Sequence, residues 1–532
     1  MLGKDTSMKI TPWICQLIVS TTIFFLNTAC HGRTPLWTFT PQTATTVSVS
    51  KDGKATIQYT ITNHSKKALT LMMSPMKGIH QATNAGSCSR RFTLNGSQSC
   101  TLTLHVIGKH LHGGVLGGPI VCERDHPLHC HQPSPSHRLA INRYNGSFLA
   151  IADIHYDQRV HTPITYGEDT GVRLWDNMQK ELATVIAMQK PKFVVYLGDS
   201  PAHTEKNRKQ NSQAVLSSFS NKMTIPFFYV NGNNDSLLMD YGPFSQKGIN
   251  LFSLDPTHHW PAMNVTRCPA RTACVYSDKT SDMANAQTFG FYSAYPLGSI
   301  TPLRLIVLNS VIFSYMYAVP PGEQQADAQL EMDWFATQLR DAQSKKEQVY
   351  IAMHIPVGHD SLNPIHHDMW NASIILNGHE TPSIEGLSLR NGFLNLLITY
   401  KNTIRALVSG HTHKETYRVI HADSTYYNPT VLALGVRGVS PMFGNNPGMQ
   451  VYFYDNIYRL MDAKTFYTTP DPGEWYNTYF RSDYACPPNT TMHTCILNQG
   501  IPSVELLSLF DPIYLFFQDF FELRTCLKSF YK

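Results

Sequence analysis

The stretch Tyr196-Leu-Gly-Asp-Ser-Pro-Ala-His203 is the most informative part of the chain. Five apolar residues, Phe193 to Leu197, run directly into Gly198 and Asp199. A short apolar run that ends at a glycine is typical of a buried strand, and such a strand delivers the next residue to the rim of its sheet. We therefore expect Asp199 to contact a ligand rather than to fill the core. Its two carboxylate oxygens allow it to bridge two cations.

Four other apolar runs end in the same way, in residues that can bind metals. Phe148 to Ile151 lead to Asp153 and His155, Pro226 to Val230 lead to Asn233, Asn234 and Asp235, residues 349–353 lead to His354, and residues 404–408 lead to His411 and His413. Taken singly, each histidine is more often structural than a metal ligand. Five strand-like runs that all end in carboxylate, amide or imidazole side chains predict one shared site.

The motifs in chain order are D-x-H, G-D, G-N-x-D, an isolated histidine after a strand, and G-H-x-H. This order resembles the calcineurin-like metallophosphoesterase family. Three details are similar to its acid sphingomyelinase-like branch: His203 follows Asp199 by four residues, the isolated histidine begins His354-Ile-Pro-Val-Gly358, and Ser440-Pro-Met-Phe-Gly-Asn-Asn-Pro447 comes late in the chain. The resemblance covers roughly residues 145 to 460. It implies an α/β layered core of two β-sheets flanked by helices.

By this resemblance the seven motif residues form a binuclear metal site. Asp153, His155 and His413 are expected to hold one ion, Asn233, His354 and His411 the other, and Asp199 is expected to bridge them. Two ions about 3.5–4 Å apart can hold a hydroxide that attacks phosphorus in line, so no serine or cysteine nucleophile is needed. Imidazoles, carboxylates and an amide together suit zinc, iron or manganese. Similarity to the zinc-using acid sphingomyelinase branch favours two zinc ions.

One motif departs from the family pattern. The usual G-N-H-[DE] reads Gly232-Asn-Asn-Asp235, which places Asn234 where a histidine usually assists the phosphate or the leaving group. An amide can donate a hydrogen bond but cannot act as a general acid near neutral pH. His203 matches a histidine of the acid sphingomyelinase-like pattern, and we expect it to protonate the leaving oxygen. The alternative is that His203 orders its loop or binds a phosphate oxygen.

The rest of the sequence predicts four segments around a phosphoesterase domain at 145–460. Residues 1–30 are expected to be a signal peptide, 36–108 an all-β, immunoglobulin-like sandwich, 109–144 a linker rich in Gly, Pro and His, and 461–532 a C-terminal extension with a terminal helix. Short segments in which apolar and polar residues alternate are rich in Thr, Val and Ile and are separated by turn residues, and this pattern predicts the sandwich. Helical spacing of the apolar residues Ile513, Phe516, Phe517, Phe520 and Leu523 predicts the terminal helix.

The leader and the cysteines favour export. Residues 10–30 contain no charged side chain and follow Lys4 and Lys9, which is typical of a secretory signal. Eight of the 11 cysteines fall into close pairs that suit disulfides in an oxidising compartment: Cys88 and Cys100, Cys122 and Cys130, Cys268 and Cys274, and Cys486 and Cys495. Cys526 has no evident partner. Cys30 resembles a lipoprotein cleavage site, and its lipidation stays open.

These features predict a secreted or periplasmic phosphoesterase, or a lysosomal or extracellular one in a eukaryote. A charged fraction of 15% without a dense Lys/Arg run does not favour nucleic-acid binding. The expected substrate is a small-molecule or lipid phosphodiester of the sphingomyelin or nucleotide type. Membrane contact would come through that substrate or through a lipidated Cys30. The sequence does not predict the oligomeric state.

Three alternatives remain open. Endopolyphosphatase-like members also carry G-N-N-D, which favours a phosphoanhydride such as polyphosphate, and a phosphomonoester is a further candidate. The third alternative is an exported adhesion or binding protein whose phosphoesterase body is inactive. Metal-capable residues at all seven motif positions argue against this third alternative.

Overall fold

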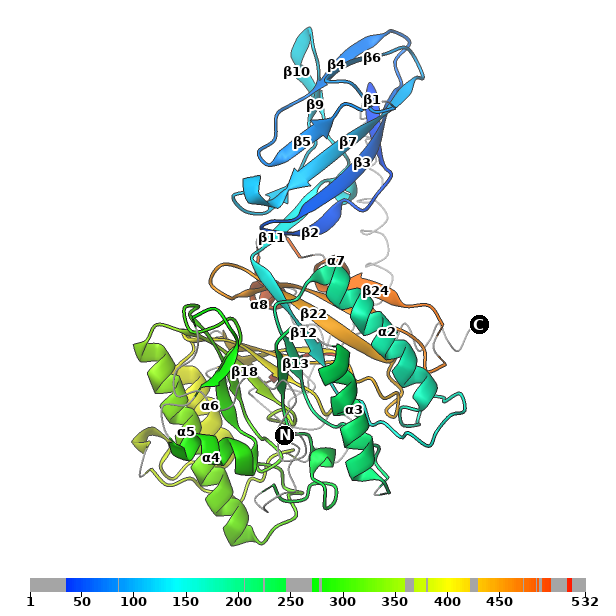
Figure 1. Cartoon of the computed structure of the whole chain (residues 1–532). Helices are drawn as coiled ribbons and strands as arrows, with labels where there is room; N and C mark the ends of the chain where they lie inside the picture. The colour runs from blue at the N-terminus through cyan, green and yellow to red at the C-terminus, as the bar shows by residue number, and fades with distance from the viewer. Residues whose placement is uncertain are drawn as a thin grey trace, which may run out of the picture.

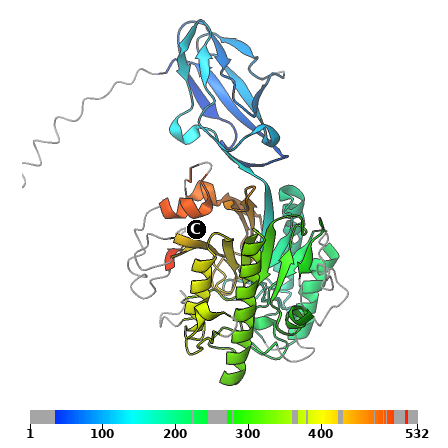
Figure 2. The ribbon, with the colours of Figure 1, turned by 90° about the vertical axis from the view of Figure 1, so that its left-hand side faces the viewer.

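The computed structural model describes residues 35–84, 86–204, 206–222, 225–244, 270–276, 280–358, 368–378, 381–421, 429–471, 473–484, 486–487, 490–498 and 514–518. An N-terminal all-β region lies at one end of a larger α/β body (Figures 1 and 2). The predicted signal peptide lies outside the described residues, as do Cys30, Cys268 and Cys526.

The N-terminal region is all-β, as predicted. One sheet has the order β1 (Trp37–Pro41), β3 (Lys54–Asn63), β7 (Ser99–Ile107) and β5 (Ile79–Ala82), and a second has the order β10 (His126–His131), β9 (Val121–Glu123), β4 (Leu69–Met73) and β6 (Arg91–Leu94). Ile57, Tyr59 and Ile61 of β3 are fully buried, whereas the residues between them are only partly buried. Successive side chains of a strand point to opposite faces, so this alternation gives β3 one core-facing side.

The segment 109–144, predicted as a linker, contains four strands instead. β9 and β10 complete the second sheet, and a third sheet joins β2 (Thr46–Ser50), β11 (Ala140–Tyr144) and β8 (Val115–Leu116). Strands of two or three residues carry little periodic pattern, and here they lie between Gly- and Pro-rich turns that dominate the composition. The disulfides Cys122–Cys130 and Cys88–Cys100 confirm two of the predicted cysteine pairs.

The first sheet of the body has six strands. Their order is β14 (Phe227–Tyr229), β13 (Val194–Tyr196), β12 (Gly146–Ile151), β22 (Gly448–Tyr454), β23 (Leu460–Tyr467) and β24 (Tyr476–Tyr479). β12, β13 and β14 are parallel and coincide with three of the predicted strands. The helices α2 (Val172–Gln189) and α3 (Arg208–Lys222) cover this sheet, because Trp175 and Phe219 belong to the same buried cluster as Val194.

The second sheet of the body has eight strands. Their order is β15 (Cys274–Tyr276), β16 (Tyr292–Tyr295), β17 (Leu303–Val307), β18 (Gln348–Met353), β19 (Ile404–Ser409), β21 (Pro429–Gly435), β20 (Thr416–His421) and β25 (Tyr514–Gln518). α4 (Thr280–Phe289), α5 (Pro321–Ser344) and α6 (Leu389–Thr399) lie on the opposite side of the body from α2 and α3 (Figure 1). The ring centroids of Phe148 in β12 and Tyr350 in β18 are 5.3 Å apart, so side chains of the two sheets pack against each other. The predicted core of two β-sheets flanked by helices is therefore confirmed.

The C-terminal extension differs from the prediction of a terminal helix. Residues 514–518 form β25, which pairs antiparallel with β20. Consecutive apolar residues fit a buried strand as well as one face of a helix, so the local pattern could not separate the two. The remaining residues of the predicted helix lie outside the described part of the chain. No helix in the described part combines the length and the apolar character needed to cross a membrane.

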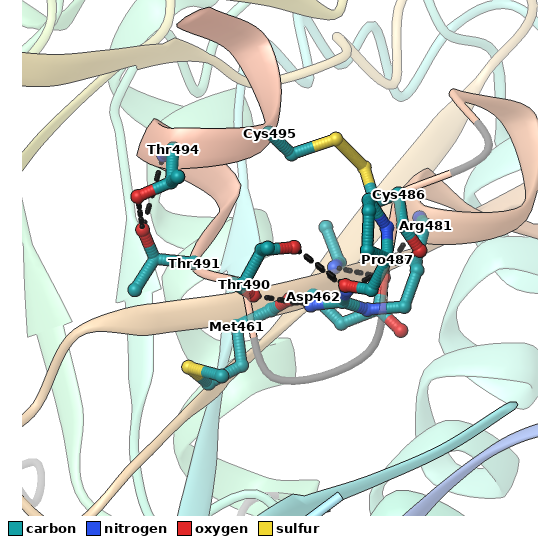
Figure 3. Close-up of a disulfide and its surroundings, with 10 residues drawn as sticks. Met461, Asp462, Arg481, Cys486, Pro487, Thr490, Thr491, Thr494 and Cys495 are labelled. Carbon is teal, nitrogen blue, oxygen red and sulfur yellow. Dashed lines mark hydrogen bonds between the residues drawn. A yellow bond between two sulfur atoms is a disulfide. The ribbon is translucent and has the colours of Figure 1, made fainter. Parts of the chain in front are cut away.

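A disulfide fixes the short helix α8 (Met492–Asn498) after α7 (Phe480–Asp483), as Figure 3 shows. Its cysteines, Cys486 and Cys495, are the third predicted pair to be confirmed. Arg481 is 2% exposed and donates to the backbone carbonyls of Met461, Pro487 and Thr490. The disulfide and this buried guanidinium together hold α8 against β23.

Candidate metal centre

The seven predicted metal ligands converge at the carboxyl ends of the central strands. Asp153 and His155 follow β12, Asp199 follows β13, Asn233 begins the 3-10 turn η3 (Asn233–Asp235) after β14, His354 follows β18, and His411 and His413 follow β19. The carboxyl ends of parallel strands meet at one edge of a sheet, which brings together residues far apart in sequence. The structure thus gathers all seven side chains at one place.

The first group consists of Asp153, His155 and His413. One donor atom of each lies within 4.8 Å of the other two. Nε2 of His155 is 3.1 Å from Nε2 of His413, and Oδ1 of Asp153 is 3.8 Å from Nε2 of His413. All three side chains are at most 1% exposed. Two imidazole nitrogens and a carboxylate at these separations form a donor set that a divalent cation can occupy.

The second group consists of Asn233, His354 and His411. The amide oxygen of Asn233 is 3.0 Å from Nε2 of His354 and 3.0 Å from Nδ1 of His411. Asp199 lies between the two groups, since its Oδ2 is 3.3 Å from Nε2 of His155 and 3.3 Å from Nε2 of His354. This is the position that the sequence predicts for a bridging carboxylate.

The backbone at the site adopts a conformation that most residues avoid. Five of the seven predicted ligands have positive φ: Asp153 (52°), His155 (45°), Asp199 (60°), His411 (71°) and His413 (56°). Such angles cost free energy in residues other than glycine and persist where the surroundings impose them, which is common at functional sites. Gly232 has a related role, because a Cβ there would lie 2.1 Å from Oδ1 of Asp199. Only glycine allows β14 to approach Asp199 so closely.

Backbone carbonyls fix the orientation of two of the histidines. Nδ1 of His354 is 2.6 Å from the carbonyl oxygen of Leu197, and Nδ1 of His413 is 3.0 Å from that of Ser440. A carbonyl oxygen can only accept, so Nδ1 carries the hydrogen in both rings. Nε2 of each ring therefore faces the site and, once deprotonated, presents its lone pair there, as in histidines that bind metals.

The electrostatics of the buried carboxylates favour a cation. Burial raises the pKa of Asp153 to about 7, although His354 opposes the shift. Burial disfavours charge on His354, but the adjacent Asp199 raises its pKa to about 9. In the described part of the chain, Oδ2 of Asp153 is buried without a hydrogen-bond partner. Two neighbouring carboxylates, one of them with an unpaired buried oxygen, form an environment that bound cations would satisfy. These residues therefore fit a divalent metal pair.

Asn234 orients the carboxylate of Asp199. It is 1% exposed, its backbone N–H donates to Oδ1 of Asp199 at 2.7 Å, and its Nδ2 donates to Oδ2 at 3.1 Å. Arg208, which is 4% exposed, donates from Nη1 to the backbone carbonyl of Asn234 at 2.5 Å. Because the backbone N–H and one side-chain N–H of Asn234 both donate to Asp199, the amide is placed to position that carboxylate.

Three aspartates that the sequence analysis did not assign support the site. Asp240 accepts from Nδ2 of Asn233 at 2.8 Å, which turns the amide oxygen of Asn233 toward the histidines. Asp235 accepts from the backbone N–H groups of Asp199, Ser200 and Gly232 at 2.7–2.8 Å. Asp169 contacts His203. Asp235 ends the quoted G-N-N-D motif, but no local pattern marks Asp169 or Asp240.

His203 lies beside the first group. Its ring stacks on that of His155 with centroids 4.0 Å apart, and its Nδ1 is 2.7 Å from Oδ1 of Asp169. Burial disfavours charge on His203, but the hydrogen bond to Asp169 raises its pKa above the usual value. Phe443, which is 43% exposed, lies edge-on to His203 and to His413. His203 and Phe443 therefore form part of the rim of the site.

This arrangement of sheets and donor groups defines the class of the protein as a metallophosphoesterase. Residues 146–415, half of the chain, match the family described as calcineurin-like phosphoesterase. The chain belongs to this family, and its relatives place it in the acid sphingomyelinase-like branch.

Two curated relatives illustrate the branch. The cyclic GMP-AMP phosphodiesterase SMPDL3A of Bos taurus is 23% identical over 300 residues, which cover 52% of this chain and 57% of that protein. Sphingomyelinase phosphodiesterase D of Dictyostelium discoideum is 22% identical over 381 residues, which cover 62% of this chain and 76% of that protein. A solved dimetal phosphatase from Danio rerio is 13% identical, with a TM-score of 0.34, and the match covers 62% of this chain and 98% of that one.

Proposed function

We propose that this chain is an exported metallohydrolase that uses two divalent ions to hydrolyse phosphodiesters. Asp153, His155 and His413 hold one ion, Asn233, His354 and His411 hold the other, and Asp199 bridges them. The observation that carries the proposal is the position of Asp199, with one carboxylate oxygen 3.3 Å from the Nε2 atoms of both His155 and His354. A carboxylate placed between two donor groups is what a two-metal centre requires.

The residues around that centre have different roles in the proposed reaction. The bound ions would supply an activated water and neutralise charge on the phosphoryl oxygens. Asn234 keeps both oxygens of Asp199 in place, and Asp240 keeps the amide oxygen of Asn233 directed at the second group. His203, oriented by Asp169, donates a proton to the leaving oxygen. Donors of this type suit zinc, iron or manganese, and similarity to the zinc-using acid sphingomyelinase branch favours zinc.

The proposal of a diester substrate rests on the rim of the site and on the relatives. Phe443 and Tyr166 are 43% and 45% exposed, and the hydroxyl of Tyr166 donates to Asn446 in the same loop as Phe443 at 2.6 Å. Exposed aromatic rings beside a phosphate site can contact an apolar or aromatic substituent of the substrate. The two relatives are named for cyclic GMP-AMP and for sphingomyelin, which are both phosphodiesters.

A phosphoanhydride is the second candidate. Asn234 cannot supply a proton, and its backbone N–H and Nδ2 both donate to Asp199. An anhydride has a good leaving group and needs little help from an acid. Export is supported by three disulfides within the described residues, since such bonds persist in oxidising compartments.

A hydrolysis panel on metal-reconstituted protein tests the proposal. Sphingomyelin, a cyclic dinucleotide, ATP, polyphosphate and a phosphomonoester are compared by kcat/KM, with Asp199→Asn as the inactive control. We expect a diester to exceed the monoester by at least about tenfold. Fastest cleavage of polyphosphate would instead favour the second candidate. Two bound ions per chain with no hydrolysis of any substrate would favour a binding protein and contradict the proposal.

A further inference from the structure

A basic hollow lies at the opposite end of the sheets from the metal centre. It has a volume of about 270 Å³, and its polar lining consists of Lys401, Asn402, Arg405, Arg459, Thr491 and His493. These residues come from the amino end of β19, from the turn before β23 and from the start of α8. The buried side chains of Ile404, Leu432 and Leu460, each at most 3% exposed, form its floor.

The hollow is separate from the metal centre. β19 begins beside the hollow at Ile404 and delivers His411 and His413 at its other end. At about 3.3 Å per residue, Arg405 and His411 are roughly 20 Å apart along the strand. α8 lies at the end of the body that carries the N-terminal β-sheets (Figure 1), and the Cys486–Cys495 disulfide holds it there.

The charges around the hollow are unbalanced. Lys401, Arg405 and Arg459 all line it, and none of its nine lining residues is acidic. Arg459 pairs with Asp455, at 2.8 Å between Nη2 and Oδ2. Within the described residues, Lys401 and Arg405 form no ion pair, and Nε of Arg405 donates only to the backbone carbonyl of Ile457 at 3.2 Å. Burial and the neighbouring Arg459 lower the pKa of Arg405, as expected where positive charges crowd together.

We propose that this hollow binds a phosphate group, carried either by free phosphate or by a small phosphate ester such as a lipid headgroup. One carboxylate against three cations leaves an excess of two positive charges, which matches a dianion better than a monoanion. Guanidinium groups bind phosphate oxygens in pairs, lysine adds a point charge, and Thr491 and Asn402 offer further hydrogen bonds. A volume of about 270 Å³ leaves room for a phosphate with a short substituent.

The test measures phosphate binding on protein from which metals have been removed by chelation, so that the metal centre no longer contributes. Inorganic phosphate is titrated by calorimetry at constant ionic strength into the unsubstituted chain, into Lys401→Gln/Arg405→Gln, and into Lys180→Gln. Lys180 is an exposed lysine of α2 and serves as the matched control. Circular dichroism and thermal unfolding, recorded before and after chelation, check that each variant is folded.

We expect one phosphate per chain and at least about a tenfold loss of affinity in the double variant, because each lost charged hydrogen bond weakens binding by about that factor. Lys180→Gln should bind like the unsubstituted chain. Absence of binding to metal-free protein, or equal binding by all three proteins, would overturn the proposal.

The source of the phosphate group is identified in a second experiment. Glycerol phosphate is compared with vesicles that contain phosphatidic acid and with vesicles of phosphatidylcholine alone. Binding of glycerol phosphate without retention on either vesicle supports a soluble ligand. Retention on phosphatidic acid vesicles that is lost in Lys401→Gln/Arg405→Gln supports a headgroup. Retention that is unchanged in the double variant contradicts the assignment of this hollow. Because the site does not use the metal centre, the result is independent of the proposed hydrolysis.

Discussion

Replacing Asp240 by alanine is expected to loosen one metal ion and leave the other in place. Oδ1 of Asp240 accepts from Nδ2 of Asn233 at 2.8 Å, and this bond turns the amide oxygen of Asn233 toward His354 and His411. A hydrogen bond to a charged group contributes about 1.5–3 kcal/mol, which corresponds to roughly 10–100-fold in affinity. That range agrees with the typical effect of removing a residue that orients a metal ligand. The group of Asp153, His155 and His413 lies on the other side of Asp199 and should retain its ion.

The assay is competition with a chelator of known affinity, combined with the metal content per chain measured by mass spectrometry. Asp240→Asn keeps an oxygen that can accept from Asn233, so its loss of affinity should be smaller than that of Asp240→Ala. Asp471→Ala, at an exposed ion pair with Arg173, is the remote control and should bind both ions normally. Equal loosening of both ions in Asp240→Ala, or no change in either, would refute the reasoning.

Three further outcomes are expected. Asn233→Ala should lose one ion and most turnover, whereas Asn234→His should keep both ions. Equal metal loss in the two variants would mean that the wrong asparagine is placed on the metal. His203→Ala should slow hydrolysis of an alkyl diester by about 10²–10⁴-fold and largely spare a nitrophenyl ester, with a smaller effect of the same kind in Asp169→Asn. Equal slowing of both esters with metals intact would make His203 a substrate-positioning residue. The side chain of Asp327 is 8% exposed. Its burial, and the nearby charge of Glu323, raise its pKa in the folded protein to about 6. In the unfolded chain the pKa of an aspartate is about 3.9. The charged form therefore destabilises the fold above pH 6, and this cost disappears as the pH falls toward 4. Asp327→Asn should thus stabilise the protein by about 1–3 kcal/mol at pH 8 and by little at pH 4, which thermal unfolding at the two pH values will measure. An equal gain at both would contradict this explanation.

The sequence predicted the parts of the site that follow directly from buried strands. Parallel strands such as β13 are covered on both faces, so they appear as unbroken apolar runs, and the next polar residue lies at the sheet edge. Asp199 and His354 could be assigned on this basis. Asp169 and Asp240 could not, because they reach the site through tertiary contacts from loops without a pattern of their own.

Short or ambiguous segments explain the remaining errors in the fold. β8 has two residues, and pairing with β11 defines it more than its own sequence does. Residues 514–518 contain apolar residues that suit either a helix or a strand, and they form a strand that pairs antiparallel with β20. In both cases the strand is defined by pairing with a strand far away in the sequence, and the local sequence pattern does not show that pairing.

The three backbone hydrogen bonds accepted by Asp235 have a consequence for engineering. They tie the loop after β13 to the loop after β14, because they reach Asp199 and Ser200 in one loop and Gly232 in the other. The two loops therefore behave as one mechanical unit, and sequence diversity introduced into either would distort both. The segment 440–447 carries the exposed Phe443 at the rim without joining this unit. A library that aims to change the substrate while keeping the metal centre should randomise Met442 and Phe443, and should retain the two tied loops and Ser440, whose carbonyl orients His413.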